Sequence, residues 1–442
     1  MLFLFAVIVG IAVGLLPGIG LFSAMVLLYP ILITFSPTDI LVFYAVMGGA
    51  SQFSGSITAC IIGAAGEPSS IPATKEGPLL FARGKGSVAI STAAIGSFIG
   101  TLIVTVVLLV SIDSITKTIE SFYNNNVQTA LFISVLGIIV LAGNNKLIVN
   151  ILYVIAGAAL ANIGFQRYSG APLTFGIPAF SNGISFVALA IGLYSLPQII
   201  TTFSNFKDFT IEKNSPIANF KESINAIKTN IGSVLRGSVI GMLAGLVPGL
   251  TTILASNLSY TVEKILRKFK RSYNSDGDLA CLISAETANN SGLLTSMLPL
   301  MIFGIPIIGS EVVVLNLIEK SGTNVGLNTL IQGGIFQTVA LYFLLGGAIS
   351  MIIAWQGANL LSKVYLIPKN ILLYSIIVIS TIAVYITGAE ANNQLFDMIC
   401  FAVCLAIGYL LRKTDTSVII FSFLIYPFLE YSALRFISIH YS

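Results

Sequence analysis

The sequence predicts an all-α polytopic membrane protein, and its composition is the first reason. Hydrophobic residues make up 56% of the 442 positions and charged residues only 9%, with a mean hydropathy of +0.94. An ordinary soluble domain carries about 25% charged residues, because its surface must be solvated. Single globular cores stop growing near about 250–300 residues, so much of this apolar sequence must face lipid.

Apolar runs recur along the whole chain, and this is the second reason. A helix needs roughly 17–25 apolar residues to cross a bilayer. Strict alternation of apolar and polar residues is absent, which argues against a β-barrel. Helices satisfy their own backbone groups in hydrocarbon, so we expect a helical bundle of about 10–14 membrane segments. Examples of the runs are Ala89–Ile112, Ala130–Leu141, Ile184–Ile200, Leu330–Ile353, Ile371–Ile386 and Phe396–Leu411.

An internal repeat is the third reason. The pattern G-x3-G-x2-P-G occurs at Gly10–Gly18 and again at Gly241–Gly249. Further on, Met47–Ser70 and Ala288–Glu311 correspond more loosely. Each has a small and polar stretch, then apolar residues, then a Gly/Pro break. Two matches in the same order argue for a duplication.

The charges of the connecting loops predict that the two repeats are inverted relative to each other. The loop Tyr29–Asp39 contains no Lys or Arg, whereas its counterpart Lys264–Asp278 contains five. The basic character swaps again between the Lys75–Lys85 loop and the Glu311–Gly322 region. Short basic loops lie in the cytoplasm, so an exchange of basic character indicates inverted topology with broken or re-entrant helices.

The repeat divides the chain into three expected parts. Residues 1–203 form a first transmembrane repeat, residues 204–230 a cytoplasmic linker and residues 231–442 a second transmembrane repeat. The linker assignment depends on a polar stretch that contains four lysines.

The two Pro–Gly breaks predict a binding site. A Pro–Gly pair removes a backbone donor and lets the chain turn, so backbone groups stay unpaired at membrane depth. Exposed helix N-termini attract anions, and exposed carbonyl ends attract cations. Gly18 and Gly249 are therefore candidate substrate-binding positions, with Thr251 just after the second break. The alternative is that the breaks only kink helices, and the glycine pairs ahead of them fit small-xxx-small helix contacts.

Polar residues inside apolar segments form a second set of candidates. Glu286, Asn289, Asn290 and Ser291 share one such segment. Burying these groups costs several kcal/mol unless they are paired or face a cavity. Carboxamide and hydroxyl oxygens suit Na⁺, and amide N–H groups suit a carboxylate. The alternative is an interhelical hydrogen-bond cluster.

The first repeat carries a milder polar set. A glutamate at the Gly/Pro break, Glu67, can titrate, coordinate an ion or cap the next segment, and the sequence leaves these roles open. The candidates for ion coupling are Glu67, Glu286, Asn289 and Asn290. The remaining first-repeat candidates for substrate binding are Ser51, Ser54, Ser56, Ser69 and Ser70.

Catalytic constellations are missing from the sequence. The only histidine is His440, three residues from the end, and there is no Walker A pattern. We expect no catalytic residue, no cofactor, no metal other than a coupling Na⁺, and no nucleic-acid partner. Active transport would then draw on an ion gradient or on another chain.

These elements together resemble the large membrane subunit of the tripartite tricarboxylate transporters over nearly the whole chain. The matching motifs are GLLPGIG (Gly14–Gly20), SGSIT (Ser54–Thr58), GEPSS (Gly66–Ser70), GLVPG (Gly245–Gly249), ETANN (Glu286–Asn290), FGIP (Phe303–Pro306) and the segment Ile407–Arg435. The resemblance implies uptake of small organic anions, tri- or dicarboxylates, across the inner membrane of a prokaryote, driven by Na⁺ or H⁺. It also implies two partners, a small membrane subunit and a periplasmic solute-binding protein, beside the membrane lipid. It selects Gly18, Gly249, Ser69, Asn289 and Asn290 as site residues.

Other functions remain open at this point. One is a permease for another small solute, such as an amino acid. Another is an intramembrane enzyme that uses Glu67 and Glu286, and a third is a membrane scaffold. The favoured interpretation is an ion-coupled permease that works by alternating access.

Overall fold

The computed structural model describes residues 2–16, 19–121, 125–142, 145–165, 172–205, 220–248, 251–323, 331–361, 363, 367–390 and 393–441. Over these residues the chain is almost entirely helical, and the one strand pairing among them joins β1 (Gly164–Phe165) to β2 (Pro172–Leu173). The helices of the first half are α1 (Leu2–Leu15), α2 (Gly20–Leu27), α3 (Tyr29–Leu32), α4 (Pro37–Ile62), α5 (Ile71–Ala82), α6 (Gly86–Glu120), α7 (Asn125–Ala142), α8 (Leu147–Ala161), α9 (Phe186–Ala190) and α10 (Leu196–Asn205). Those of the second half are α11 (Phe220–Thr229), α12 (Ile231–Ala244), α13 (Thr251–Phe269), α14 (Leu279–Phe303), α15 (Gly309–Lys320), α16 (Ile335–Leu361), α17 (Lys369–Glu390), α18 (Gln394–Leu410) and α19 (Ser417–Tyr441).

The predicted fold class is confirmed. By length and composition, five of the described helices are long and apolar enough to cross a membrane, and five shorter ones are also apolar. The long ones span Pro37–Ile62, Gly86–Glu120, Phe186–Ser204, Ile335–Gly357 and Asn370–Gly388. The protein is an all-α polytopic membrane protein.

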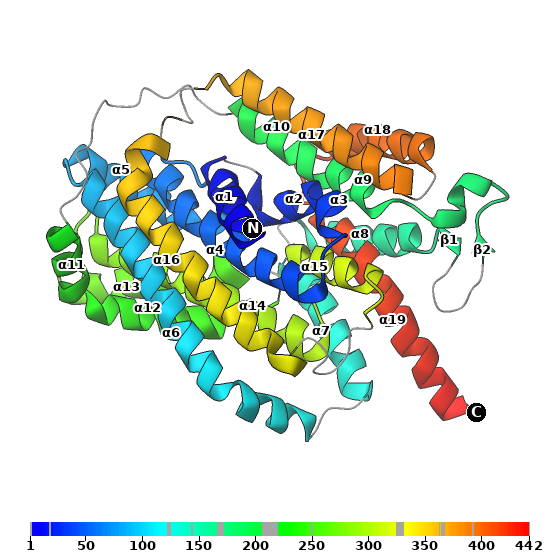
Figure 1. The fold of residues 1–442 in the computed structure, drawn as a ribbon, viewed down its shortest axis with the longest axis horizontal. Helices are drawn as coiled ribbons and strands as arrows, with labels where there is room; N and C mark the ends of the chain where they lie inside the picture. The colour runs from blue at the N-terminus through cyan, green and yellow to red at the C-terminus, as the bar shows by residue number, and fades with distance from the viewer. Residues whose placement is uncertain are drawn as a thin grey trace.

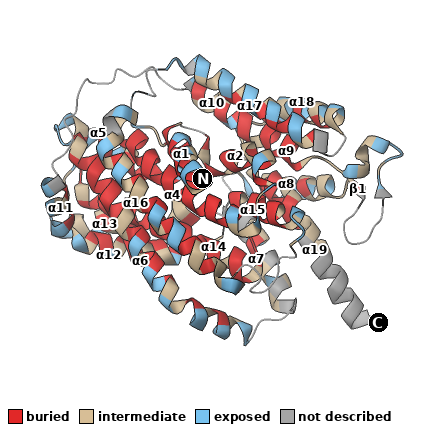
Figure 2. Ribbon diagram, in the orientation of Figure 1, coloured by how far each residue is buried: buried red, intermediate tan, exposed pale blue. Residues whose placement is uncertain are grey.

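Two buried helices, α4 and α14, form the centre of the bundle (Figure 2). Every residue from Ile40 to Cys60 and from Ala280 to Leu298 is buried. The Ser56 hydroxyl donates a hydrogen bond to the Glu286 carboxylate. Eight residues earlier in α4, Gly48 faces the Leu293 side chain. Along this contact the residue numbers decrease in α4 while they increase in α14, so the two helices cross antiparallel.

Both central helices have the same start and stop signals. Ser36 caps α4 by accepting a hydrogen bond from the Asp39 N–H at 3.2 Å. Asp278 caps α14 by accepting from the Ala280 N–H at 3.0 Å. Each helix ends at a glycine in the left-handed region, where a side chain would be strained. These glycines are Gly63 (φ 67°) and Gly304 (φ 69°), and the second lies 241 positions after the first.

The glycines ahead of the breaks hold α1 and α12 tightly against the central helices. A Cβ at Gly10 would overlap Met47 and Ala50 of α4, and one at Gly241 would overlap Ala288 and Ser291 of α14. Ala288 and Ser291 lie 241 positions after Met47 and Ala50. The helix-contact interpretation of these glycines is therefore confirmed, and the two contacts share one register.

One long helix of each half, α6 and α16, packs on the central helix of the other half. Gly100 of α6 lies on Thr287 of α14. Gly346 of α16 lies on Val46 of α4, and a Cβ atom at Gly346 would be 2.9 Å from the Val46 side chain. Thr287 again lies 241 positions after Val46. The two halves are therefore intertwined, and α6 and α16 run side by side across one face (Figure 1).

The broken helices also match. α1 and α12 each have 14 residues, and each ends just before a Pro–Gly break. At about 1.5 Å per residue such a helix is about 21 Å long, less than the roughly 30 Å of hydrocarbon. New helices, α2 and α13, begin just after the breaks. Gly18 and Gly249 themselves lie outside the described residues.

The remaining helices form an outer layer. α17 packs on α18, α18 packs on the turn Ile191–Ser195 between α9 and α10, and α8 packs on α19 (Figure 1). Part of the expected linker is helical: α11 packs on α6, where the hydroxyls of Ser223 and Ser91 lie 2.6 Å apart. The expected boundaries at residues 203 and 230 stay predictions.

We predict that Gly241→Ala destabilises the protein, because its methyl group would collide with the backbone of α14. Overpacking of this kind costs roughly 1–3 kcal/mol. The measurement is the midpoint of thermal unfolding of the detergent-purified protein. Gly137→Ala in α7 is the matched control, since a Cβ there meets nothing within 4 Å. Equal midpoints for the two variants would contradict the close contact.

Candidate functional site

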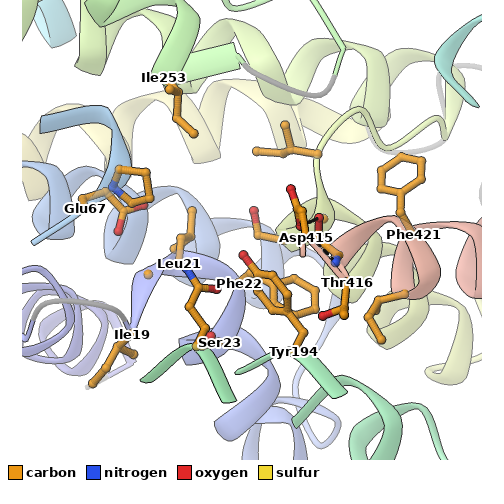
Figure 3. A pocket seen from close by; sticks show the side chains of 18 of the residues that line it. Ile19, Leu21, Phe22, Ser23, Glu67, Tyr194, Ile253, Asp415, Thr416 and Phe421 are labelled. Atoms are coloured by element: carbon orange, nitrogen blue, oxygen red, sulfur yellow. Dashed lines mark hydrogen bonds between the residues drawn. The ribbon is translucent and has the colours of Figure 1, made fainter. Parts of the chain in front are cut away.

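A cavity of about 910 Å³ lies where the interrupted segments of both halves meet. The first half lines it with Ile19–Ser23 at the start of α2 and with Ala65–Pro68 ahead of α5. The second half lines it with Thr251–Ile253 and Ile308–Ser310. Outer-layer residues close it, among them Tyr194, Asp415, Thr416 and Phe421 (Figure 3).

Helix N-termini from both halves converge on this cavity. α2 begins at Gly20, α13 at Thr251, α15 at Gly309 and α19 at Ser417, and all four of these residues line the cavity. The first turn of a helix leaves backbone N–H groups without intrahelical partners, and the helix dipole adds partial positive charge. The arrangement therefore favours negatively charged groups at the cavity, and two of the four N-termini, those of α2 and α19, already hold carboxylates of the protein.

The charged side chains at the cavity are few. Arg412 and Lys413 are exposed and line it. The Arg412 guanidinium lies 4.2 Å from the centre of the Tyr409 ring, and its Nη1 donates to the Tyr409 carbonyl at 2.8 Å. This holds one cation at the edge of the cavity. The arginine can still offer further N–H donors to an anion.

Two carboxylates, Glu67 and Asp415, also line the cavity. Glu67 accepts a hydrogen bond from the Leu21 N–H at the start of α2, and its Oε2 has no partner. Asp415 accepts from the Ser417 N–H at 3.1 Å, at the start of α19. Each carboxylate is therefore held at a helix N-terminus, which offsets part of its charge.

An aromatic pair forms one wall. Phe22 and Tyr194 pack edge to face, with ring centres 5.3 Å apart (Figure 3). Tyr194 lies in a π-helical turn, an irregularity that is frequent at functional sites. The Thr416 hydroxyl donates to the Leu193 carbonyl of this turn at 2.9 Å. This aromatic wall thus joins the start of α2 to the outer layer of helices.

The structure places the predicted residues in two groups. Glu67 and Thr251 line the cavity. The candidate serines do not line it and are all buried. Most of their hydroxyls donate to backbone carbonyls one turn earlier in the chain, as in Ser51 to Gly48 and Ser291 to Thr287. The others with such bonds are Ser54, Ser56 and Ser70.

The remaining serine, Ser69, lies in the short turn ahead of α5. Its carbonyl accepts from the Ser256 hydroxyl of α13, and its own hydroxyl has no partner. It therefore joins the two halves next to the cavity.

Glu286 and the two asparagines of α14 differ in their contacts. Glu286 is hydrogen-bonded across the helices to Ser56. Asn289 and Asn290 are 0% exposed, and neither the oxygen nor the nitrogen of either side chain has a hydrogen-bond partner. An unpaired buried polar group costs roughly 1–3 kcal/mol, so the asparagines form an unsatisfied polar cluster.

Gln52 belongs to the same region. The antiparallel register, set by Ser56 against Glu286 and Gly48 against Leu293, places Gln52 opposite the asparagines. Gln52 lines the cavity, and its Oε1 is buried without a partner. The unsatisfied cluster therefore adjoins the cavity.

Some lining residues were not predicted. Tyr194, Gln198, Arg412 and Lys413 come from the outer layer. The sequence offered two signals for Arg412 and Lys413: they end the apolar run Phe396–Leu411, and they lie within the segment Ile407–Arg435 that resembles the transporter family. Nothing local in the sequence indicates that this segment returns to the breaks.

Apolar helices long enough to cross a membrane, arranged around a cavity shared by two corresponding halves, define a polytopic membrane protein with an internal cavity. The comparison with protein families then gives its identity. The chain belongs to the tripartite tricarboxylate transporter TctA family, whose model matches residues 1–422. The predicted resemblance is confirmed, and the protein is of a transporter family rather than an enzyme family.

Two relatives come from Agrobacterium vitis. The chain is 27% identical over 428 residues, 96% of this chain and 84% of the relative, to an uncharacterized 52.8 kDa protein in the TAR-I ttuC' 3' region. It is 28% identical over 193 residues, 43% of this chain and 78% of the relative, to an uncharacterized protein in the TAR-II ttuC' 3' region. No solved structure matches the chain.

We predict that a cysteine at position 252 reacts with a charged thiol reagent, whereas one at position 291 does not. Thr252 lines the cavity, and Ser291 is buried between helices. Thr252→Cys and Ser291→Cys would be made in a background with Cys60, Cys281, Cys400 and Cys404 replaced by alanine. Labelling of detergent-purified protein is followed by mass spectrometry. Equal labelling of the two cysteines would contradict the assignment of position 252 to the cavity wall and of position 291 to the buried helix contact.

Proposed function

We propose that this protein is the substrate-translocating subunit of a secondary transporter that moves small carboxylates, tri- or dicarboxylates, across the inner membrane of a prokaryote. Transport is coupled to Na⁺ or H⁺ and proceeds by alternating access. The observation that carries the proposal is the convergence of helix N-termini from both halves on one cavity, with Arg412 at its edge.

The dimensions of the cavity support a small organic anion. Ligand sites typically have about 300–1,000 Å³, and this one has about 910 Å³. Carboxylates on a short carbon skeleton fit such a site, because each carboxylate can meet one group of N–H donors. The Phe22 and Tyr194 rings offer an apolar wall to the skeleton.

Alternating access is supported by the relation between the halves. The contacted positions of α4 and α14 correspond at a separation of 241 residues, and these two helices cross antiparallel. A two-fold axis that relates antiparallel helices is perpendicular to both. If these helices cross the membrane, the axis lies in the membrane plane, which is the relation of inverted repeats.

A coupling cation fits the unsatisfied cluster beside the cavity. Asn289, Asn290 and Gln52 offer amide oxygens, which are ligands suited to Na⁺. A bound cation would satisfy oxygens that otherwise stay unpaired in the core. It would also oppose the charge of an anionic substrate in the adjoining cavity.

The name of the family supports the proposed partners. A tripartite system pairs this subunit with a small membrane subunit and a periplasmic solute-binding protein. The helices of the outer layer expose large apolar side chains, such as Ile371 and Val378 of α17, which suit lipid or a membrane partner.

One observation favours a second candidate. Glu67 presents an unpaired carboxylate oxygen at the cavity, and this would suit the ammonium group of an amino acid. Uptake of labelled citrate, succinate and amino acids into proteoliposomes separates the two candidates. The carboxylates are expected to be taken up.

We predict that Arg412→Gln raises the KM for citrate uptake by about tenfold or more, since a hydrogen bond to a charged group contributes roughly 1.5–3 kcal/mol. Arg83→Gln is the matched control, because Arg83 is exposed at the end of α5 and does not line the cavity. An unchanged KM in the Arg412 variant would remove this residue from the site.

We predict that Asn290→Ala abolishes stimulation of uptake by a Na⁺ gradient while the protein still inserts and purifies normally. The reason is the loss of one amide oxygen from the unsatisfied cluster. Asn225→Ala, on the exposed face of α11, is expected to behave as wild type. Full Na⁺ stimulation of the Asn290 variant would contradict the assignment.

A further inference from the structure

Glu311 is a buried carboxyl group that the predicted site residues do not include. It lies in the first turn of α15 and is 0% exposed. Its Oε2 accepts a hydrogen bond from the Ile307 N–H at 2.8 Å, and its Oε1 has no partner. Among the described residues, no lysine or arginine forms an ion pair with it; Arg236 pairs with Glu263, and Arg267 pairs with Asp278.

Two opposing effects act on this carboxyl group. Burial without an ion pair favours the neutral, protonated form. The N-terminus of α15 and the Ile307 N–H favour the ionised form. Burial and the start of α15 therefore act on the charge of this carboxyl group in opposite directions.

Along the chain, Glu311 is one residue away from the cavity wall. The adjacent Ser310 lines the cavity, and its hydroxyl lies 3.0 Å from the Tyr44 hydroxyl of α4. Glu311 therefore lies close to the cavity without facing it directly.

The other neighbouring elements add little charge. α2, which packs on α15, has no titratable side chain. The buried glutamate of α14, Glu286, is paired with Ser56. On α19 the described titratable side chains are Tyr426 and Glu430, and Asp415 precedes that helix at the cavity. A charged ligand that enters or leaves the cavity would therefore be the main change of charge near Glu311.

We propose that Glu311 is a proton-binding site that couples proton movement to carboxylate transport, a proposal that rests on the proposed function. Water in the cavity delivers a proton that adds to a carboxylate oxygen of Glu311, and the proton returns to water after the cavity opens to the other side. A substrate carboxylate in the cavity favours the protonated form, because two nearby negative charges repel. By linkage, a protonated Glu311 increases the affinity for the substrate by the same factor.

The test compares two assays on proteoliposomes that contain the full chain and its partner subunits, with citrate as the probe. Counterflow exchanges labelled for unlabelled citrate at equal pH and needs no net proton movement. Accumulation is driven by a pH gradient, acid outside. Glu311→Gln mimics the protonated carboxyl group, and we expect it to keep counterflow and lose accumulation. Glu319→Gln, on the same helix and only partly buried, is the control and is expected to keep both.

Equilibrium binding gives a second measurement if the Glu311 variant purifies poorly in lipid. In the wild type, one proton bound together with citrate changes the apparent Kd by up to about tenfold per pH unit. Tyr44→Phe removes the hydroxyl that faces Ser310 and is expected to slow proton uptake at an unchanged Kd.

The outcomes separate the two proposals. Absence of counterflow with any carboxylate in the wild type would overturn the transporter proposal and this inference with it. Wild-type counterflow together with pH-driven accumulation by Glu311→Gln would overturn the proton site alone. Loss of accumulation in both glutamate variants would show that the effect is not specific to Glu311 and would overturn it as well.

Discussion

The antiparallel contact between α4 and α14 is the constraint on which the rest of the structure depends. Both helices are buried along nearly their whole length, so no lipid separates them from their neighbours. Their outer surfaces receive α1 and α12 through glycines, and these leave room for backbone-to-backbone contact. Because α6 and α16 cross over to the opposite central helix, neither half can pack fully without the other. The cavity forms where these two intertwined halves leave their interrupted segments facing each other.

Several buried polar groups near this contact have no hydrogen-bond partner, and their presence there needs a physical reason. Each such group costs stability in a medium without water. The serines of α4 avoid the cost by donating to carbonyls of their own helix. Asn289, Asn290 and Glu311 do not avoid it. Groups that stay unsatisfied in a core otherwise well paired are the groups that a ligand or a proton can satisfy.

The sequence predicted the features that depend on local chemistry. The small-xxx-small pairs that begin at Gly10 and at Gly241 indicated helix contacts. The alignment of Met47–Ser70 with Ala288–Glu311 has a separation of 241 positions, and the contacted residues of α4 and α14 show the same separation. The sequence could not indicate which helix each glycine meets, because that partner lies far along the chain. For the same reason Arg412 was missed. Its approach to the breaks depends on the outer layer, whose packing leaves no local pattern.

The correspondence between the halves makes their differences informative. At the cavity, Gln52 of the first half corresponds to Leu293 of the second, and Glu67 corresponds to Ile308; all four line the cavity. The first half thus supplies the polar member of each pair. Glu311 reverses this bias, since it occupies the position that corresponds to Ser70. In the proposed alternating-access mechanism, the two corresponding halves give two related states of the protein, one open to each side of the membrane. A ligand bound to unlike halves cannot interact equally in both, and that difference lets a coupled ion bias the direction of transport.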